Sequence, residues 1–64
     1  MGKNKYYLAR ALEGKTQLQV AAESGIHVTI VSQLEHGWRV PTPDQIKKLK
    51  KALHKLDEAE LLVK

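Results

Sequence analysis

Four side chains between positions 28 and 33 have chemistry suited to the edges of DNA bases: Val28, Thr29, Ser32 and Gln33. The carboxamide of Gln33 carries a donor beside an acceptor, which matches N7 and N6 of adenine. The methyl groups of Val28 and Thr29 suit the methyl group of thymine. Because no arginine or lysine lies among these residues, the strongest reader of guanine is missing and the set favours A·T pairs.

Three further side chains are candidates for contacts with DNA phosphates: Gln17, His27 and Arg39. Gln17 lies at the expected start of a helix, where an amide beside free backbone N–H groups can hold an anion. Arg39 lies just beyond the base-contact candidates and can contact a phosphate or enter a minor groove. Alternatively, Gln17 is only a helix-start residue and Arg39 an ordinary surface arginine. His27 is interpreted equally well as an exposed turn residue or as a phosphate or base contact.

The base-contact candidates also have structural interpretations that need no DNA. Val28 can be buried at the start of a helix, and Ser32 can pack on the core or bond to its own helix. Thr29 and Gln33 can be solvated surface. The nearby Trp38 can fill space beneath a loop, which we favour, or stack on DNA.

Helix-forming and capping signals place all these residues on or beside short helices. Residues 5–13 are mostly good helix formers, and Tyr6 and Ala9 share an inward face. Gly14 can end this helix in the left-handed conformation. Residues 1–4 are expected to be frayed.

Two more helices are expected at about residues 17–24 and 28–36. Thr16 and Gln19 form a capping-box pattern at the start of the first of these. Gly37 is expected to end the second.

The remaining chain predicts two further helices. Thr42 and Gln45 form another capping box, with Pro43 at the first helical position. The helix behind it carries an apolar stripe made of Ile46, Leu49, Leu53 and Leu56. A last short helix is expected over residues 58–63, with Asp57 as its cap. Its apolar residues are Leu61, Leu62 and Val63. They either close the core, which we favour slightly, or form a dimer contact.

Residues 17–36 have the layout of a helix-turn-helix. Six small or apolar residues stand where they would fix the angle between the two helices: Val20, Ala21, Gly25, Ile26, Val31 and Leu34. With these residues inward, the opposite face of the second helix is free to enter a major groove. Any one of them is weak evidence, but six in register, followed by Glu35, Gly37 and Pro41, make a specific signal.

At these positions the chain resembles the Cro/C1-type (XRE-like) helix-turn-helix family of lambdoid phage repressors and Cro proteins. The resemblance covers about residues 5–53. Its matching residues are Arg10, Gly14, Thr16, Gln17, Val20, Ala21, Gly25, Ile26, Val31, Ser32, Leu34, Glu35, Gly37, Pro41, Ile46, Lys47, Lys48, Leu49, Lys51, Ala52 and Leu53.

The resemblance implies a five-helix fold, binding to operator DNA, a homodimer and a role in transcription regulation. It also implies that Gln17 contacts phosphate and that Arg10 and Glu35 form an ion pair across the core. This chain departs from the family at four positions: Lys15, Ser24, His27 and Lys50. Lys15 and Ser24 should weaken the core. His27 replaces a serine cap, which should leave that helix start loosely held or ordered only by phosphate.

Composition agrees with a binding role and disfavours catalysis. Lysine and arginine number 11 against 7 acidic residues, which gives a net charge of +4 and favours an anionic partner. There are no cysteines, and the three histidines lack the spacing of metal ligands. We expect no metal, cofactor or small-molecule ligand, no enzyme activity, no membrane span or signal peptide, and a cytoplasmic location.

We therefore predict an all-α, compact five-helix, lambda-repressor-like domain comprising residues 1–64, with a core over residues 5–56 and a short helix over residues 57–64. The predicted function is that of a sequence-specific regulator of transcription, a repressor in our interpretation. It would bind two-fold symmetric double-stranded DNA as a weak or DNA-induced homodimer. The alternative is a protein-interaction module, including an antitoxin-like partner, on the same fold.

Overall fold

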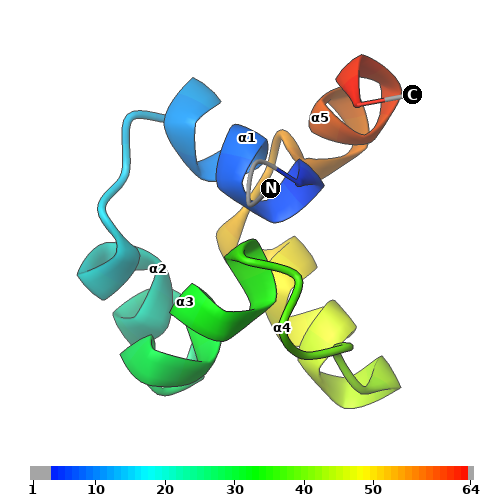
Figure 1. Cartoon of the computed structure of the whole chain (residues 1–64). Helices are drawn as coiled ribbons and strands as arrows, with labels where there is room; N and C mark the ends of the chain where they lie inside the picture. Colours follow the sequence, from blue (N-terminus) through cyan, green and yellow to red (C-terminus); the bar gives the residue numbers. More distant parts are fainter. Residues whose placement is uncertain (1–3, 64) are drawn as a thin grey trace.

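The computed structural model describes residues 4–63, which form five α-helices and no strand (Figure 1). The helices are α1 (Lys5–Leu12), α2 (Gln17–Ser24), α3 (Val28–Glu35), α4 (Pro43–Ala52) and α5 (Leu56–Leu62). This order confirms the predicted all-α fold. Helix α1 packs mainly on α5, whereas α2 contacts both α3 and α4. Figure 1 accordingly places α1 and α5 at one end of the molecule and the α2–α3 pair at the other.

A single buried cluster joins all five helices. Its members are Tyr6, Ala9, Val20, Ile26, Val31, Leu34, Leu49, Ala52, Leu53, Leu56 and Ala59. Ala21 is only partly buried and packs against this cluster. The core therefore extends to Ala59, three residues beyond its predicted limit of Leu56, because α5 contributes to it.

Both predicted capping boxes are present. The Thr16 hydroxyl accepts a hydrogen bond from the Gln19 backbone N–H at 3.1 Å, and the Gln19 side chain accepts one from Thr16 N–H at 2.8 Å. Thr42 and Gln45 repeat the arrangement at 3.2 and 3.1 Å. Each box satisfies two backbone donors that would otherwise lack a partner, so α2 and α4 begin at fixed residues.

The N-terminal boundary is better ordered than the sequence predicted. The side chain of Asn4 accepts hydrogen bonds from the backbone N–H groups of Tyr6 and Tyr7, which makes it the cap of α1. Its amide also donates to the carbonyl oxygen of Leu34 at 2.6 Å. The prediction that Asn4 is frayed was wrong, because a contact 30 residues away holds it. Residues 1–3, which shared that prediction, lie outside the described residues.

The boundary between α4 and α5 also differs from the prediction. Leu53 has an extended backbone, with φ −114° and ψ 93°, and ends α4 there. Helix α5 begins at Leu56, so Asp57 lies inside the helix and the predicted cap at Asp57 was wrong. The carboxylate of Glu13 instead accepts a hydrogen bond from the Lys55 backbone N–H at 2.8 Å. An acid from the end of α1 thus holds the start of α5.

Lys15 and Ser24, which were expected to weaken the core, both have defined structural partners. The Lys15 ammonium group lies 3.2 Å from Glu13, 2.6 Å from Glu23 and 2.7 Å from the carbonyl oxygen of Ala52 at the end of α4. The buried Ser24 hydroxyl accepts a hydrogen bond from the Ile26 N–H at 3.2 Å. Neither side chain therefore leaves a buried polar atom without a hydrogen-bond partner.

Two predictions about apolar side chains were wrong. Leu61, Leu62 and Val63 do not close the core, because they are 70%, 64% and 42% exposed. Only Leu56 and Ala59 of α5 are buried. Trp38 does not fill space beneath its loop: it is 74% exposed and stacks on His36, with ring centroids 4.6 Å apart.

Candidate nucleic-acid interface

The turn between α2 and α3 fixes how these two helices meet. Gly25 has φ +77°, a left-handed conformation that L side chains rarely adopt, and its N–H donates to the Ala21 carbonyl at 2.9 Å. The next residue, Ile26, is buried in the core. This arrangement confirms the predicted two helices and turn of residues 17–36.

His27 caps α3 directly. Its Nδ1 atom accepts a hydrogen bond from the Thr29 N–H at 3.1 Å. The expectation that this helix start is loosely held, or needs phosphate to order it, was therefore wrong. The imidazole performs the role of a serine hydroxyl, and this bond requires the tautomer whose proton is on Nε2.

Helix α3 has one buried and one outward face. Val31, Leu34 and Glu35 are buried. On the outward face Thr29 is exposed, whereas Val28, Ser32 and Gln33 are partly buried. The four predicted base contacts therefore remain accessible on one short helix, although to different degrees.

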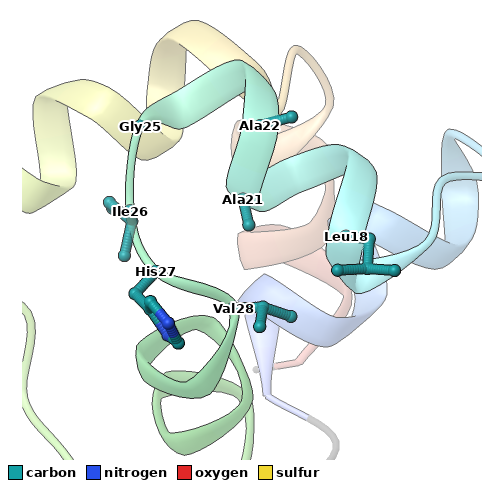
Figure 2. Close-up of a pocket in the computed structure, with 7 residues that line it drawn as sticks. All are labelled: Leu18, Ala21, Ala22, Gly25, Ile26, His27 and Val28. Carbon is teal, nitrogen blue, oxygen red and sulfur yellow. The ribbon is translucent and has the colours of Figure 1, made fainter.

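A shallow hollow separates the start of α3 from α2. It is lined by Leu18, Ala21, Ala22, Gly25, Ile26, His27 and Val28. Figure 2 shows that Ala21 and Val28 point into the gap between the two helices, and that Leu18 lies near the start of α2. One side of Val28 thus faces α2 and the other remains accessible. Val28 is therefore partly buried, between the two predicted alternatives.

An ion pair lies beneath α3. Arg10 donates from Nε to one Glu35 oxygen at 2.7 Å and from Nη2 to the other at 3.1 Å. Its third bond, from Nη1, reaches the Lys15 carbonyl at 3.0 Å. Gln17 Nε2 also donates to Glu35, at 3.1 Å. Glu35, only 3% exposed, therefore joins residues from α1 and α2 to α3.

The outward face of α3 carries no formal charge, because the charged residue of this helix is buried in the ion pair. The hydrogen bonds with Glu35 raise the pKa of Arg10 above its ordinary value, so the guanidinium stays charged. Glu35 is the one charged residue of α3. Because it is buried, the exposed side of the helix carries no formal charge. No acidic group there opposes a phosphate backbone.

The turn after α3 places the positively charged Arg39 beside this neutral face. Gly37, with φ +75°, reverses the chain, and the Trp38 N–H donates to the Gln33 carbonyl at 3.0 Å. Arg39 then donates from Nε to the side-chain oxygen of Gln33 at 2.8 Å. A predicted phosphate contact and a predicted base contact are thus hydrogen-bonded to each other.

The sequence reasoning missed this bond. The signal was the glycine at position 37, because a left-handed residue after a helix folds the following residues back over its last turn. Identifying Gln33 as the acceptor requires the side-chain positions as well.

Other positive groups are distributed over α4 and the turn that follows it. Lys48 pairs with Asp44 at 3.3 Å. Four lysines form no ion pair within residues 4–63: Lys47, Lys50, Lys51 and Lys55. They are available to an anionic surface, but within residues 4–63 none of these lysines forms an ion pair with an α3 residue.

No group of three metal-binding side chains occurs within residues 4–63. Across the same residues, no helix has both the length and the apolar character needed to cross a membrane. In comparisons with known proteins, the sequence model of the helix-turn-helix family matched residues 7–61. Neither a curated protein nor a solved structure matched the chain.

Proposed function

The chain belongs to the helix-turn-helix family, of the Cro/C1 type, whose members are DNA-binding regulators, and from this premise we propose that it represses transcription by reading a specific double-stranded sequence. The observation that carries the proposal is the neutral outward face of α3, fixed at both ends. His27 caps its start and the Gly37 turn fixes its end. Such a face fits a major groove without repelling the phosphates on either side.

In this proposal, phosphate contacts lie on the flanks of α3. Gln17 uses one N–H of its amide on Glu35 and keeps a second N–H for a phosphate oxygen. It stands at the first position of α2, where the capping box leaves the N–H groups of Gln17 and Leu18 without helical partners. A phosphate that binds there would fix the register of α3 in the groove.

His27 has a more limited part. Its Nδ1 accepts a backbone bond, so only Nε2–H remains to donate to phosphate. Thr29, Ser32 and Gln33 form the base-reading set, and Val28 contributes its exposed side to a thymine methyl group.

Salt dependence tests whether DNA is the partner. If the bound protein makes 6–10 phosphate contacts, affinity for its selected site should fall by roughly 10³–10⁵ between 50 and 200 mM salt. The site is first obtained by selection from random duplexes, and binding is then measured by fluorescence anisotropy. A shallow slope with no sequence preference would contradict the proposal and favour the protein-interaction alternative.

We propose a weak or DNA-induced homodimer. Half-sites on one face of DNA repeat about 34 Å apart, and the longest extent of the domain's backbone is 26 Å. With that axis along the DNA, two copies leave roughly 8 Å between them, which side chains from both can span. The exposed Leu61, Leu62 and Val63 supply apolar side chains for such a contact.

Sedimentation of the free protein at micromolar concentration tests whether the homodimer is weak in the absence of DNA. We expect mostly monomer without DNA and two copies per duplex on a two-fold site. A tight dimer without DNA would overturn this expectation.

The repressor role is tested separately, by transcription in vitro from a promoter that overlaps the selected site: added protein should lower the yield of transcript, and an increase would contradict it.

A further inference from the structure

Gln33 accepts two hydrogen bonds from the turn that follows α3, one from Trp38 and one from Arg39. The Gln33 carbonyl accepts the Trp38 N–H at 3.0 Å, and its side-chain oxygen accepts the Arg39 Nε–H at 2.8 Å. Both bonds come from the turn that Gly37 creates. The position of Arg39 relative to Gln33 is therefore set by the backbone as well as by the side chains.

A stack of rings supports the same turn. His36 Nδ1 lies 2.8 Å from the Ser32 carbonyl, and the ring of Trp38 stacks on the ring of His36 at 4.6 Å. Although Trp38 is largely exposed, this contact orders the residue that precedes Arg39. The turn thus directs a charged side chain toward a neutral helix face.

The bond changes what Gln33 presents to a base. An isolated glutamine offers one donor and one acceptor, which matches adenine. Here the acceptor oxygen is engaged by Arg39, and the free groups are the Nε2 hydrogens of Gln33 and the Nη hydrogens of Arg39. The major-groove edge of guanine offers two acceptors, N7 and O6, whereas adenine places its N6 donor where O6 would lie.

We propose that Arg39 determines specificity: held by Gln33, it enters the major groove, and the two side chains together read a guanine. This inference rests on the proposed function, since it concerns the base read by the same face of α3. It replaces the adenine contact predicted for Gln33 alone and the phosphate or minor-groove contact predicted for Arg39.

The experiment is selection from random duplexes followed by affinity measurements on all four bases at each selected position. It compares the wild type with Arg39→Ala, Arg39→Lys and Gln33→Ala. Lys50→Ala is the matched control, because it also removes one exposed positive charge but lies on α4. Thermal melts of all five proteins check that the fold is intact.

For the wild type we expect a guanine at one position, preferred over adenine by roughly 5- to 150-fold. Arg39→Ala should abolish this preference and shift the position toward adenine, since the Gln33 oxygen becomes free. Arg39→Lys should behave similarly, because lysine keeps the charge but lacks the planar fork. Gln33→Ala should weaken the preference at the same position, and Lys50→Ala should leave it unchanged.

A different pattern would overturn the inference. If Arg39 contacts only phosphate, Arg39→Ala should weaken binding to all sequences equally and lower the salt slope by about one, while Arg39→Lys resembles the wild type. An adenine at the Gln33-dependent position of the wild type would also overturn it. Failure of the proposed function is distinguishable, because then the wild type itself selects no sequence.

Discussion

Two arginines contact α3 from opposite sides through nearly identical hydrogen bonds. Beneath the helix, Arg10 Nε lies 2.7 Å from a Glu35 oxygen. On its outer surface, Arg39 Nε lies 2.8 Å from the Gln33 oxygen. The first pair is largely buried, with side-chain exposures of 18% and 4%, whereas Arg39 is exposed.

Burial and the charge of the partner, more than bond length, decide what such a contact does. We call Arg10 and Glu35 the inner pair, and Gln33 and Arg39 the outer pair. Removing one partner of the inner pair leaves a charge in a site that water cannot easily solvate. Removing Arg39 leaves a neutral amide that water solvates at once. The inner pair therefore governs how the helices assemble, and the outer pair is free to bind a ligand.

The largest effect is expected for the inner pair. Arg10→Ala or Glu35→Ala should lower the free energy of unfolding by about 3–5 kcal/mol, because either leaves its partner charged and buried. For a domain of this size, each kcal/mol corresponds to a shift in Tm of about 4–8 °C. Thermal denaturation followed by circular dichroism measures the change.

A double replacement sharpens this prediction. Arg10→Met with Glu35→Leu removes both charges and keeps apolar volume, so it should be less destabilising than either single alanine variant. Single variants that melt within a degree or two of the wild type would show that the pair does not support the fold.

A third polar cluster is about as buried as Arg10 and Glu35 but should show a smaller effect, because Lys15 keeps Glu23 and the Ala52 carbonyl as partners when Glu13 is replaced. The side chains of Glu13 and Lys15 are 7% and 19% exposed. Glu13→Ala removes the hydrogen bond between its charged carboxylate and the Lys55 N–H and should cost about 1–3 kcal/mol in urea denaturation. The matched control is Glu23→Ala, which removes the more exposed partner of Lys15 and should change stability by less than about 0.5 kcal/mol. Equal losses in both variants would refute the ranking by burial.

The same cluster predicts a dependence on pH. Burial alone would raise the pKa of Glu13, but the hydrogen bond from Lys55 N–H and the contacts with Lys15 together lower it below 4.5. A lowered pKa means that the contribution to stability is complete above pH 4.5 and is lost as pH falls through the folded-state pKa. Glu13→Gln should therefore flatten the loss of stability below pH 4.5, measured by urea denaturation; an unchanged profile would count against it.

A smaller effect is expected at the start of α3. His27→Ala removes the bond to the Thr29 N–H and should cost about 1 kcal/mol, as for other helix caps. His27→Ser restores a hydroxyl cap and should recover that loss. If both variants unfold at the same denaturant concentration as the wild type, the imidazole does not cap the helix.

The smallest effect on stability is expected for the outer pair. Arg39→Ala should change the free energy of unfolding by less than about 0.5 kcal/mol, because both groups are solvated once separated. Urea denaturation at neutral pH tests this value. A loss comparable to that of Arg10→Ala would abolish the contrast between the two faces of α3.

The sequence by itself determined the elements whose causes are local. The capping boxes at Thr16 and Thr42 act within four residues, and Gly25 needs only its own backbone freedom to make the turn. Helical spacing likewise identified Val31 and Leu34 as the buried side of α3. The inner ion pair was anticipated only through family resemblance.

The tertiary structure decided the contacts that join distant segments. Asn4 bonds to Leu34, and Glu13 to Lys55, across 30 and 42 residues, and no periodicity encodes such pairs. Gln33 and Arg39 are only six residues apart, yet their bond depends on how the chain reverses at Gly37. A side chain's hydrogen-bonding capacity follows from its type, but which groups remain free for a ligand is known only once the folded chain has used the others.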